Sequence, residues 1–399
     1  MGKNIYYYVV AAVIILGLVM PQQGPKKKNY IILMAALHAF VCGWRYKFLT
    51  GDLIKYEWGF SHNMANDWLS NEVFAEGRNF GFFWFEKFIN NFISSDFQWV
   101  LIIIAIITEV TLAILIYKYS PRPWLSYLMW NCVGLYIFGF SAIKQALAMG
   151  LLMPACDGLL SDKRSKFFLW TLLAGAIHAP ALVFLPAYWI THNDKKGSWL
   201  ILAAAALLII VFRVRVAEFI SQFYYTDDAL EEMAFNNDGG FGGRFLMMVL
   251  LLVMGFMVKG LSGRTFRRVF KLIAVAAVLQ TFSNFDNVFT RLADYYFQFV
   301  VLYTPMLFFD FEKHGSDRKI FHLDRGATLL AMVGVVCFSL WFYSSKCLNY
   351  TSTYEVDNYT NYRFCWEEED PFKRGDPEED IYQDSLFEFH AFGSGEYEI

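Results

Sequence analysis

The sequence predicts an all-α, polytopic transmembrane helical bundle. Of its 399 residues, 56% are hydrophobic and only 18% are charged, whereas charged residues make up about 25% of a typical soluble domain. Apolar runs of helical length recur along the chain, and lysine and arginine gather in the short polar segments between them. Short basic loops stay on the cytoplasmic side of a membrane. The pattern therefore favours about 11–12 membrane helices with large extracytoplasmic loops.

The net charge of −3 conceals a division of the chain. Residues 346–399 contain fourteen acidic and four basic residues and carry a net charge of −10, which leaves +7 for residues 1–345. We therefore predict a transmembrane domain over residues 1–345 and an acidic, extracytoplasmic tail over residues 346–399. Whether Cys347 and Cys365 of this tail form a disulfide is left open. The basic residues form no single patch, which argues against nucleic-acid binding.

The apolar runs, taken in order, give the predicted helices. A helix needs about 20 apolar residues to cross the hydrocarbon core, and shorter helices are tolerated inside a bundle. The runs are 5–20, 29–44, 97–117, 124–140, 142–159, 167–190, 199–214, 245–258, 270–282, 292–309 and 327–343. The first run lacks a small-residue cleavage site, so we predict a retained span rather than a signal peptide.

The run 167–190 conflicts with the charge rule. Basic clusters at Lys163–Lys166 and Lys195–Lys196 flank it on both sides, and both clusters would be cytoplasmic. Pro180 follows His178 in the middle of the run, and a proline interrupts the helical hydrogen-bond ladder. A hairpin that turns near His178 satisfies both clusters. The alternative is one continuous span that violates the charge rule locally.

Two loops on the predicted outer side are long. The loop 45–98 contains an aromatic stretch from Phe80 to Ile89, which is expected to lie at the membrane interface. The loop 214–244 is acidic and rich in glycine. We expect it to act as a lid over a site, with a passive connector as the alternative.

Isolated polar residues at the outer ends of apolar runs are the candidate functional residues, because an ionisable group near a membrane helix is costly. Lys144 and Gln145 begin a helix, where free backbone N–H groups already favour an anion. His178 lies at the predicted helix break and is a candidate general base or hydrogen-bond donor. Arg291 begins a later helix, and Asp294 follows one turn on, where the two can pair.

Three further candidates lie near helix ends. Arg45 and Asp52 flank a glycine turn and are predicted to share one pocket, and Arg244 opens a late helix. Each can instead be a snorkelling or structural residue. Several cations on one side of the membrane predict an anionic ligand of the polyphosphate type. No P-loop, GxSxG or metal-binding motif is present, so no metal or cofactor is predicted.

Several short motifs follow one another along the chain, namely Gly43-Trp44-Arg45-Tyr46 leading to Gly51-Asp52 and Tyr56, Asn79 to Phe83, Ser141 to Ala148, Ala176 to Leu182, and Arg291 with Tyr295-Tyr296-Phe297. In this order they resemble the EpsG family of Wzy-like bacterial polysaccharide polymerases. Two departures stand out. Lys144 occupies a position where the family usually has arginine, and Asp52 lacks the threonine and tyrosine that commonly flank the aspartate.

The resemblance implies a multi-pass glycosyltransferase of the bacterial cytoplasmic membrane with its site facing outward. Such an enzyme transfers an undecaprenyl-diphosphate-linked glycan chain onto the non-reducing end of a lipid-linked repeat unit. It needs no nucleotide or metal, and it admits a chain-length regulator as a further partner. The implied diphosphate-binding residues are Arg45, Lys144, Arg244 and Arg291. The implied base is Asp52 or His178, and the implied substrate contacts are Tyr56, Gln145, Tyr295 and Tyr296.

Three alternatives stay open. An O-antigen ligase-like enzyme performs the same chemistry on a different acceptor. A lipid-linked-sugar glycosyltransferase would carry acidic residues in its first outer loop, and Asp52 and Glu57 fit that description. A polysaccharide flippase or transporter would show internal repeats and polar residues at mid-membrane. The chain has no evident repeat, and its polar residues lie at helix ends, which favours an enzyme.

Overall fold

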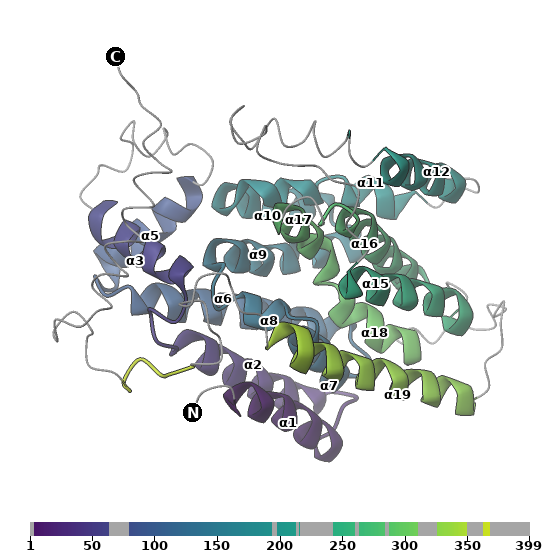
Figure 1. Cartoon of the computed structure of the whole chain (residues 1–399), viewed down its shortest axis with the longest axis horizontal. Coiled ribbons are helices and arrows are strands. Elements are labelled where there is room, and N and C mark those ends of the chain that lie inside the picture. Colours follow the sequence, from purple (N-terminus) through teal and green to yellow (C-terminus); the bar gives the residue numbers. More distant parts are fainter. Residues whose placement is uncertain are drawn as a thin grey trace.

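The computed structural model describes residues 4–63, 80–193, 198–212, 215, 242–259, 263–283, 287–309, 325–348 and 362–367. The described residues are 81% helical and contain no β-strand, which confirms the predicted all-α class. Their helices pack into one bundle in which long helices run side by side (Figure 1).

The helices occur in the following order along the chain. The first part of the chain contains α1 (Asn4–Val19), α2 (Lys27–Gly43), α3 (Gly51–Asn63), α5 (Phe80–Phe92), α6 (Gln98–Tyr119), α7 (Pro123–Cys132), α8 (Leu135–Phe138), α9 (Ile143–Leu160) and α10 (Arg164–Ile177). The second part contains the 3-10 helix η1 (Ala179–Phe184), α11 (Ala187–His192), α12 (Ser198–Val211), α15 (Gly243–Met254), the π-helix η2 (Gly255–Lys259), α16 (Arg264–Gln280), α17 (Asn287–Phe297), α18 (Val300–Phe308), α19 (Arg325–Phe342) and the π-helical turn η3 (Tyr343–Cys347).

Three helical segments of the described chain are long and apolar enough to cross a membrane, namely Gln98–Tyr119, Ile143–Leu160 and Gly326–Ser345. Other apolar runs are divided into shorter helices. The run 124–140, for example, becomes α7 and α8 because Gly134 adopts a left-handed conformation (φ 85°) that ends a helix and that glycine reaches without a steric penalty. On α6, apolar side chains stay exposed along one stripe that contains Trp99, Ile106, Val110 and Ile114, as expected of a face that meets lipid.

The chain turns back at His178. This residue is extended (φ −147°, ψ 103°) between α10 and η1. Phe167, near the start of α10, lies against Phe184 and Tyr188, with ring centroids 5.8 and 5.5 Å apart. The hairpin predicted for the run 167–190 is therefore confirmed over residues 164–192.

The bundle has two chemically different ends. Helix α6 ends, and α10 and α16 begin, at one end of the bundle. We call it the basic end, because these helix ends carry Lys118, Lys166 and Arg268. Salt bridges join these helix ends, such as the 2.8 Å contact between Lys118 Nζ and Asp157 Oδ2. We call the opposite end, where α9 begins and α10 finishes at His178, the site end. Helices α3 and α5 lie at this end, on the left of Figure 1.

Candidate functional site

The start of α9 lies at the centre of the site end. The turn 139–141 leads into α9, and the Ser141 hydroxyl donates to Asp52 Oδ2 at 3.1 Å. Lys144 Nζ lies 5.2 Å from the ring centroid of Tyr56 and 5.1 Å from that of Phe82, within the range of a cation–π interaction. Helices α3 and α5 therefore close around the ammonium group from two sides.

Helix α5 reaches this position through a close approach to α10. A Cβ atom at Gly81 would lie 2.7 Å from the carbonyl oxygen of Ala176, so only glycine permits this crossing without a shift of the backbone. Phe82, the next residue, is buried at 1% exposure. The aromatic stretch was predicted as an interfacial segment, and in the structure its helix also presents a ring to the site.

Helix α17 joins the site through a side-chain amide. Gln145 Nε2 donates to the carbonyl oxygen of Arg291 at 3.1 Å. Gln145 is 2% exposed, and its Oε1 atom has no hydrogen-bond partner among the described residues. Gln145 and Arg291 are 146 positions apart in the sequence. The hydrogen bond between them joins the start of α9 to α17.

His178 lies near Lys144 and Arg291. Its Nδ1 atom is hydrogen-bonded to the Tyr295 hydroxyl at 2.5 Å. Burial lowers the pKa of His178 to about 4, and the positive charges of Arg291 and Lys144 act in the same direction. The imidazole is therefore neutral at physiological pH and can accept or donate a hydrogen bond without carrying charge.

Lys144 and Arg291, the two cations that act on His178, form no salt bridge with a described residue. No described carboxylate lies within salt-bridge distance of Lys144 or Arg291, and Arg291 is exposed. Cations that converge without a counter-ion attract an anionic ligand, and phosphate is an anion that both Arg and Lys bind well.

Arg244 and Asp294 form an ion pair beside this group. Asp294 is 2% exposed, and the Arg244 guanidinium also lies 5.1 Å from the ring centroid of Phe297. The spacing of the sequence predicted that Asp294 pairs with Arg291, and this was wrong. Arg244, at the start of α15, reaches the buried carboxylate, whereas Arg291 lies on the exposed side of α17.

Arg45 is set back from the other cations. It is 1% exposed, and its guanidinium donates to the carbonyls of Phe140 and Gly139 at 3.2 and 3.3 Å and to the carbonyl of Cys42. Arg45 and Asp52 thus contact the same turn, 139–141, from different sides rather than sharing an open pocket. Its contacts are those of a residue that holds the turn.

The predicted substrate contacts divide into two groups. Tyr56 lies with Phe82 beside Lys144, and Gln145 and Tyr295 contact residues of the site directly. Tyr296 points elsewhere, because its hydroxyl donates to the Val183 carbonyl at 2.7 Å. Tyr296 therefore fastens η1 to α17.

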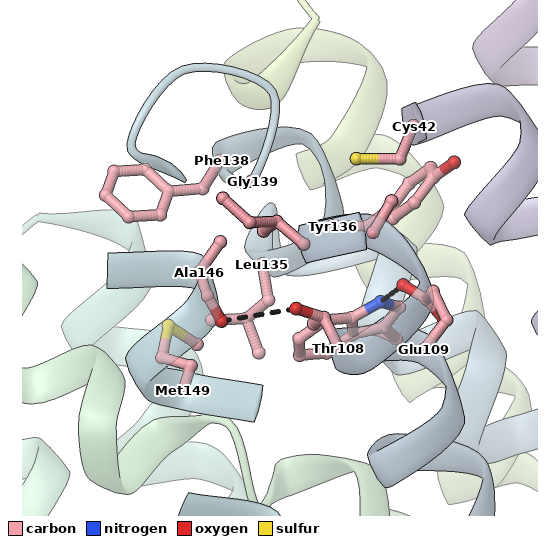
Figure 2. A pocket seen from close by; sticks show the side chains of 12 residues that line it. Cys42, Thr108, Glu109, Leu135, Tyr136, Phe138, Gly139, Ala146 and Met149 are labelled. Atoms are coloured by element: carbon pink, nitrogen blue, oxygen red, sulfur yellow. Dashed lines mark hydrogen bonds between the residues drawn. The ribbon is translucent and has the colours of Figure 1, made fainter. Parts of the chain in front are cut away.

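A small cavity lies behind the turn (Figure 2). Its volume is about 20 Å³, which suffices for one water molecule. Glu109 Oε1 accepts a hydrogen bond from Trp130 Nε1 at 3.0 Å, and the Thr108 hydroxyl donates to the Ala146 carbonyl at 3.4 Å. The cavity belongs to the packing between α6, α8 and α9 rather than to the cluster around Lys144.

Sequence reasoning missed two contributors. Ser141, which contacts Asp52, was quoted within a motif but not selected, although a polar residue just before a helix is a common contact residue. Residues 362–367, which pack against the end of α2, carried no sequence signal because their partners are distant in the sequence; Tyr362 and Val41, for example, are 321 positions apart. The predicted lid 214–244 lies almost entirely outside the described residues, as does the tail beyond residue 367.

Comparison with known families gives one result that covers most of the chain. Residues 28–356 match the EpsG family. No curated protein and no solved structure matches the chain.

Proposed function

Because the chain belongs to the EpsG family of Wzy-like polysaccharide polymerases, we propose that its substrate is an undecaprenyl-diphosphate-linked glycan. The enzyme transfers this glycan onto the non-reducing end of a second lipid-linked repeat unit. The observation that carries the proposal is the convergence of Lys144 and Arg291, two cations without a carboxylate partner in the described chain, beside Asp52 and His178.

The step is a displacement at the anomeric carbon of the growing chain. The acceptor hydroxyl oxygen forms the new bond to that carbon, and its proton passes to a base. The bond between the anomeric carbon and the diphosphate oxygen breaks, and the diphosphate leaves with the electron pair. Lys144 and Arg291 stabilise the negative charge that develops on the leaving group, which is commonly the largest contribution in such transfers.

Asp52 is the base in this proposal. Its Oδ2 atom accepts a hydrogen bond from Ser141, which orients the carboxylate at the start of α9 and leaves it further lone pairs for the acceptor proton. His178 is the second candidate, and its neutral imidazole and its bond to Tyr295 also suit it to orient an acceptor hydroxyl.

Neighbouring side chains hold the cations of the proposed diphosphate site in place. Gln145 fixes the backbone at Arg291, and the rings of Tyr56 and Phe82 confine Lys144. Arg244 lies at the edge and is held by Asp294. Tyr56 is placed to contact sugar or lipid next to the diphosphate, whereas Tyr295 is fully buried and orients His178.

The proposed orientation has the basic end in the cytoplasm and the site end outside. Lysines and arginines at the end of α6, at the start of α10 and at the start of α16 lie at the basic end, and short basic loops stay cytoplasmic. A reporter fused after Tyr343 should therefore be active outside the cytoplasm. A cytoplasmic signal there would contradict the orientation.

The test uses the full-length protein in lipid vesicles. The substrate is the lipid-linked repeat unit isolated from cells that lack this gene. We expect a ladder of longer lipid-linked chains without added nucleotide and in the presence of a metal chelator. If purified protein yields no product longer than the substrate, or requires a nucleotide for elongation, the proposed transfer is wrong.

A further inference from the structure

A short segment of the C-terminal tail folds back onto the end of α2 (yellow, lower left in Figure 1). We call residues 362–367 the strap. Arg45 and Phe364 face each other in an antiparallel bridge. Two backbone hydrogen bonds of 2.9 Å flank this pair, from Tyr46 N–H to Arg363 O and from Cys365 N–H to Trp44 O. The strap thus pairs with residues 44–46, which directly follow α2, on both sides of Arg45.

The strap is inserted into the bundle by Tyr362. This side chain is fully buried, and its hydroxyl donates to the Val41 carbonyl at 2.8 Å. Its ring meets Tyr6 and Phe140 edge-on, with centroids 5.8 and 6.2 Å apart. Edge-to-face aromatic pairs contribute about 0.5–1.5 kcal/mol beyond the burial of their area. The strap is therefore part of the packed core at the site end.

Arg45 lies directly under the strap and transmits its position to the turn 139–141. The guanidinium lies 5.2 Å from the ring centroid of Phe140 and donates to the carbonyls of Gly139 and Phe140. A guanidinium is planar and presents its N–H groups in a fixed fork. A shift of the Arg45 backbone therefore moves the carbonyls of the turn with it.

The turn 139–141 is connected to the residues of the site. Ser141, its last residue, donates to Asp52, and Lys144 follows in the first turn of α9. A continuous set of contacts thus leads from Tyr362 through Arg45 and the turn to Asp52 and Lys144. The strap lies outside residues 28–356, the part of the chain that matches the family.

We propose that the strap is a positioning element of the active site, which sets the geometry of Asp52 and Lys144 through Arg45. The inference rests on the proposed function, because it assigns the strap a role in that same transfer. Displacements of about 1 Å at a reacting group can reduce a rate about 100-fold. Loss of the strap should therefore reduce the rate of chain elongation at least about 10-fold.

Two truncations test the strap in the reconstituted elongation assay. A chain that ends after Glu367 keeps the strap and removes only residues 368–399, so it should elongate at the wild-type rate. A chain that ends after residue 361 lacks the strap and should lose elongation at least about 10-fold. Equal rates for the two truncations would overturn the proposal.

Point substitutions separate positioning from stability. Tyr362→Ala removes the ring and should reduce elongation, whereas Tyr362→Phe keeps the ring contacts and should retain most of it. A double-mutant cycle with Arg45→Lys measures the coupling between Tyr362 and Arg45 in the elongation rate. General destabilisation of the protein would not produce such a coupling. Residues that act on one group are non-additive, so Tyr362→Ala should cause little further loss in the Arg45→Lys protein. Fully additive losses would show that the strap acts independently of Arg45.

The assay also separates this inference from the proposed function. If Lys144→Ala and Arg291→Ala abolish elongation but loss of the strap changes nothing, only the strap proposal fails. If the chain that ends after residue 361 fails to insert, a second measurement on the full-length chain decides. In an otherwise cysteine-free variant that retains Cys365, Tyr362→Ala should raise the rate of maleimide labelling, because the strap is no longer held to α2. An unchanged labelling rate would mean that Tyr362 does not anchor the strap, and the proposal would be wrong.

Discussion

The two ends of the bundle both carry charged side chains, but they use them differently. At the basic end each of two aspartates contacts more than one basic side chain. Asp157 contacts Lys118 and Lys166, and Asp162 contacts Arg268 and Arg264. At the site end no described carboxylate lies within salt-bridge distance of Lys144 or Arg291, and Asp294 acts on Arg291 only at longer range. The presence of counter-ions thus separates charges that hold the fold from charges that are available to a ligand.

Buried or half-buried cations without counter-ions are costly to a fold. The basic end reduces that cost internally, because Arg268 at 2% exposure donates to the carbonyl of Leu159 and to Asp162. At the site end the half-buried Lys144 has no such counter-ion among the described residues. This difference predicts that substitutions at the site end impair catalysis and that substitutions at the basic end impair stability.

The largest expected effect is at Asp52. Asp52→Asn removes the proposed base, and general-base catalysis contributes about 10²–10⁴-fold. We expect a loss of elongation of that size with normal insertion, measured as chain length in the vesicle assay. Glu57→Gln, in the same helix α3, is the matched control and should elongate normally. If the two variants behave alike, Asp52 is not the base.

The next effect is at the unpaired cations. Arg291→Ala and Lys144→Ala each remove one group that stabilises the leaving diphosphate, and loss of one such donor costs about 10²–10³-fold. Elongation should fall accordingly, and Lys144→Arg should retain much of it because the charge is kept. Arg264→Ala, at the basic end, should have no effect on elongation. A loss with Arg264→Ala equal to that with Arg291→Ala would remove the distinction between the two ends.

A smaller effect of a different kind is expected at the basic end. Asp157→Asn leaves Lys118 and Lys166 without their shared carboxylate, and a lost charged hydrogen-bond partner costs about 1–3 kcal/mol. The Tm of the purified protein should fall by a few degrees, while the elongation rate per molecule of folded protein stays the same. An unchanged Tm together with slower elongation would assign Asp157 to the site instead.

The smallest effect concerns pH and His178. Burial, followed by Arg291 and Lys144, lowers the pKa of His178 to about 4 in the folded protein, against about 6.5 in an unfolded chain. Between these values the unfolded state binds a proton that the folded state does not, so stability falls as the pH falls from 6.5 to 4. The Tm of wild type should drop more between pH 7.5 and pH 5 than that of His178→Gln. Equal drops would show that His178 is not held neutral.

The sequence predicted the helical class and the hairpin at His178, and it selected several residues that the fold brings together around Lys144. These rest on local signals, namely apolar runs, the loop charges and a proline after a polar residue. It could not predict which cation pairs with Asp294, because Arg244 comes from another helix that the tertiary fold places beside it. Arg45 was expected among the diphosphate contacts, and only the packing of the turn reveals that its N–H groups go to carbonyls.

The short helices are a second lesson. Hydropathy alone joins residues 124–140 into one span, yet Gly134 divides them into α7 and α8. A glycine in an apolar run is compatible with either outcome until its backbone conformation is known. The strap was beyond sequence reasoning for a related reason, since Tyr362 finds Val41, Tyr6 and Phe140 only in the folded bundle.

The central claim is that the unpaired cations of the site end bind the lipid diphosphate. The most direct measurement is the affinity of undecaprenyl diphosphate for the full-length protein in lipid nanodiscs. One charged hydrogen bond contributes about 1.5–3 kcal/mol, so Lys144→Ala and Arg291→Ala should each weaken binding at least about 10-fold. Arg264→Ala should bind like wild type. Unchanged affinity in the first two variants, or an equal loss in all three, would contradict the account.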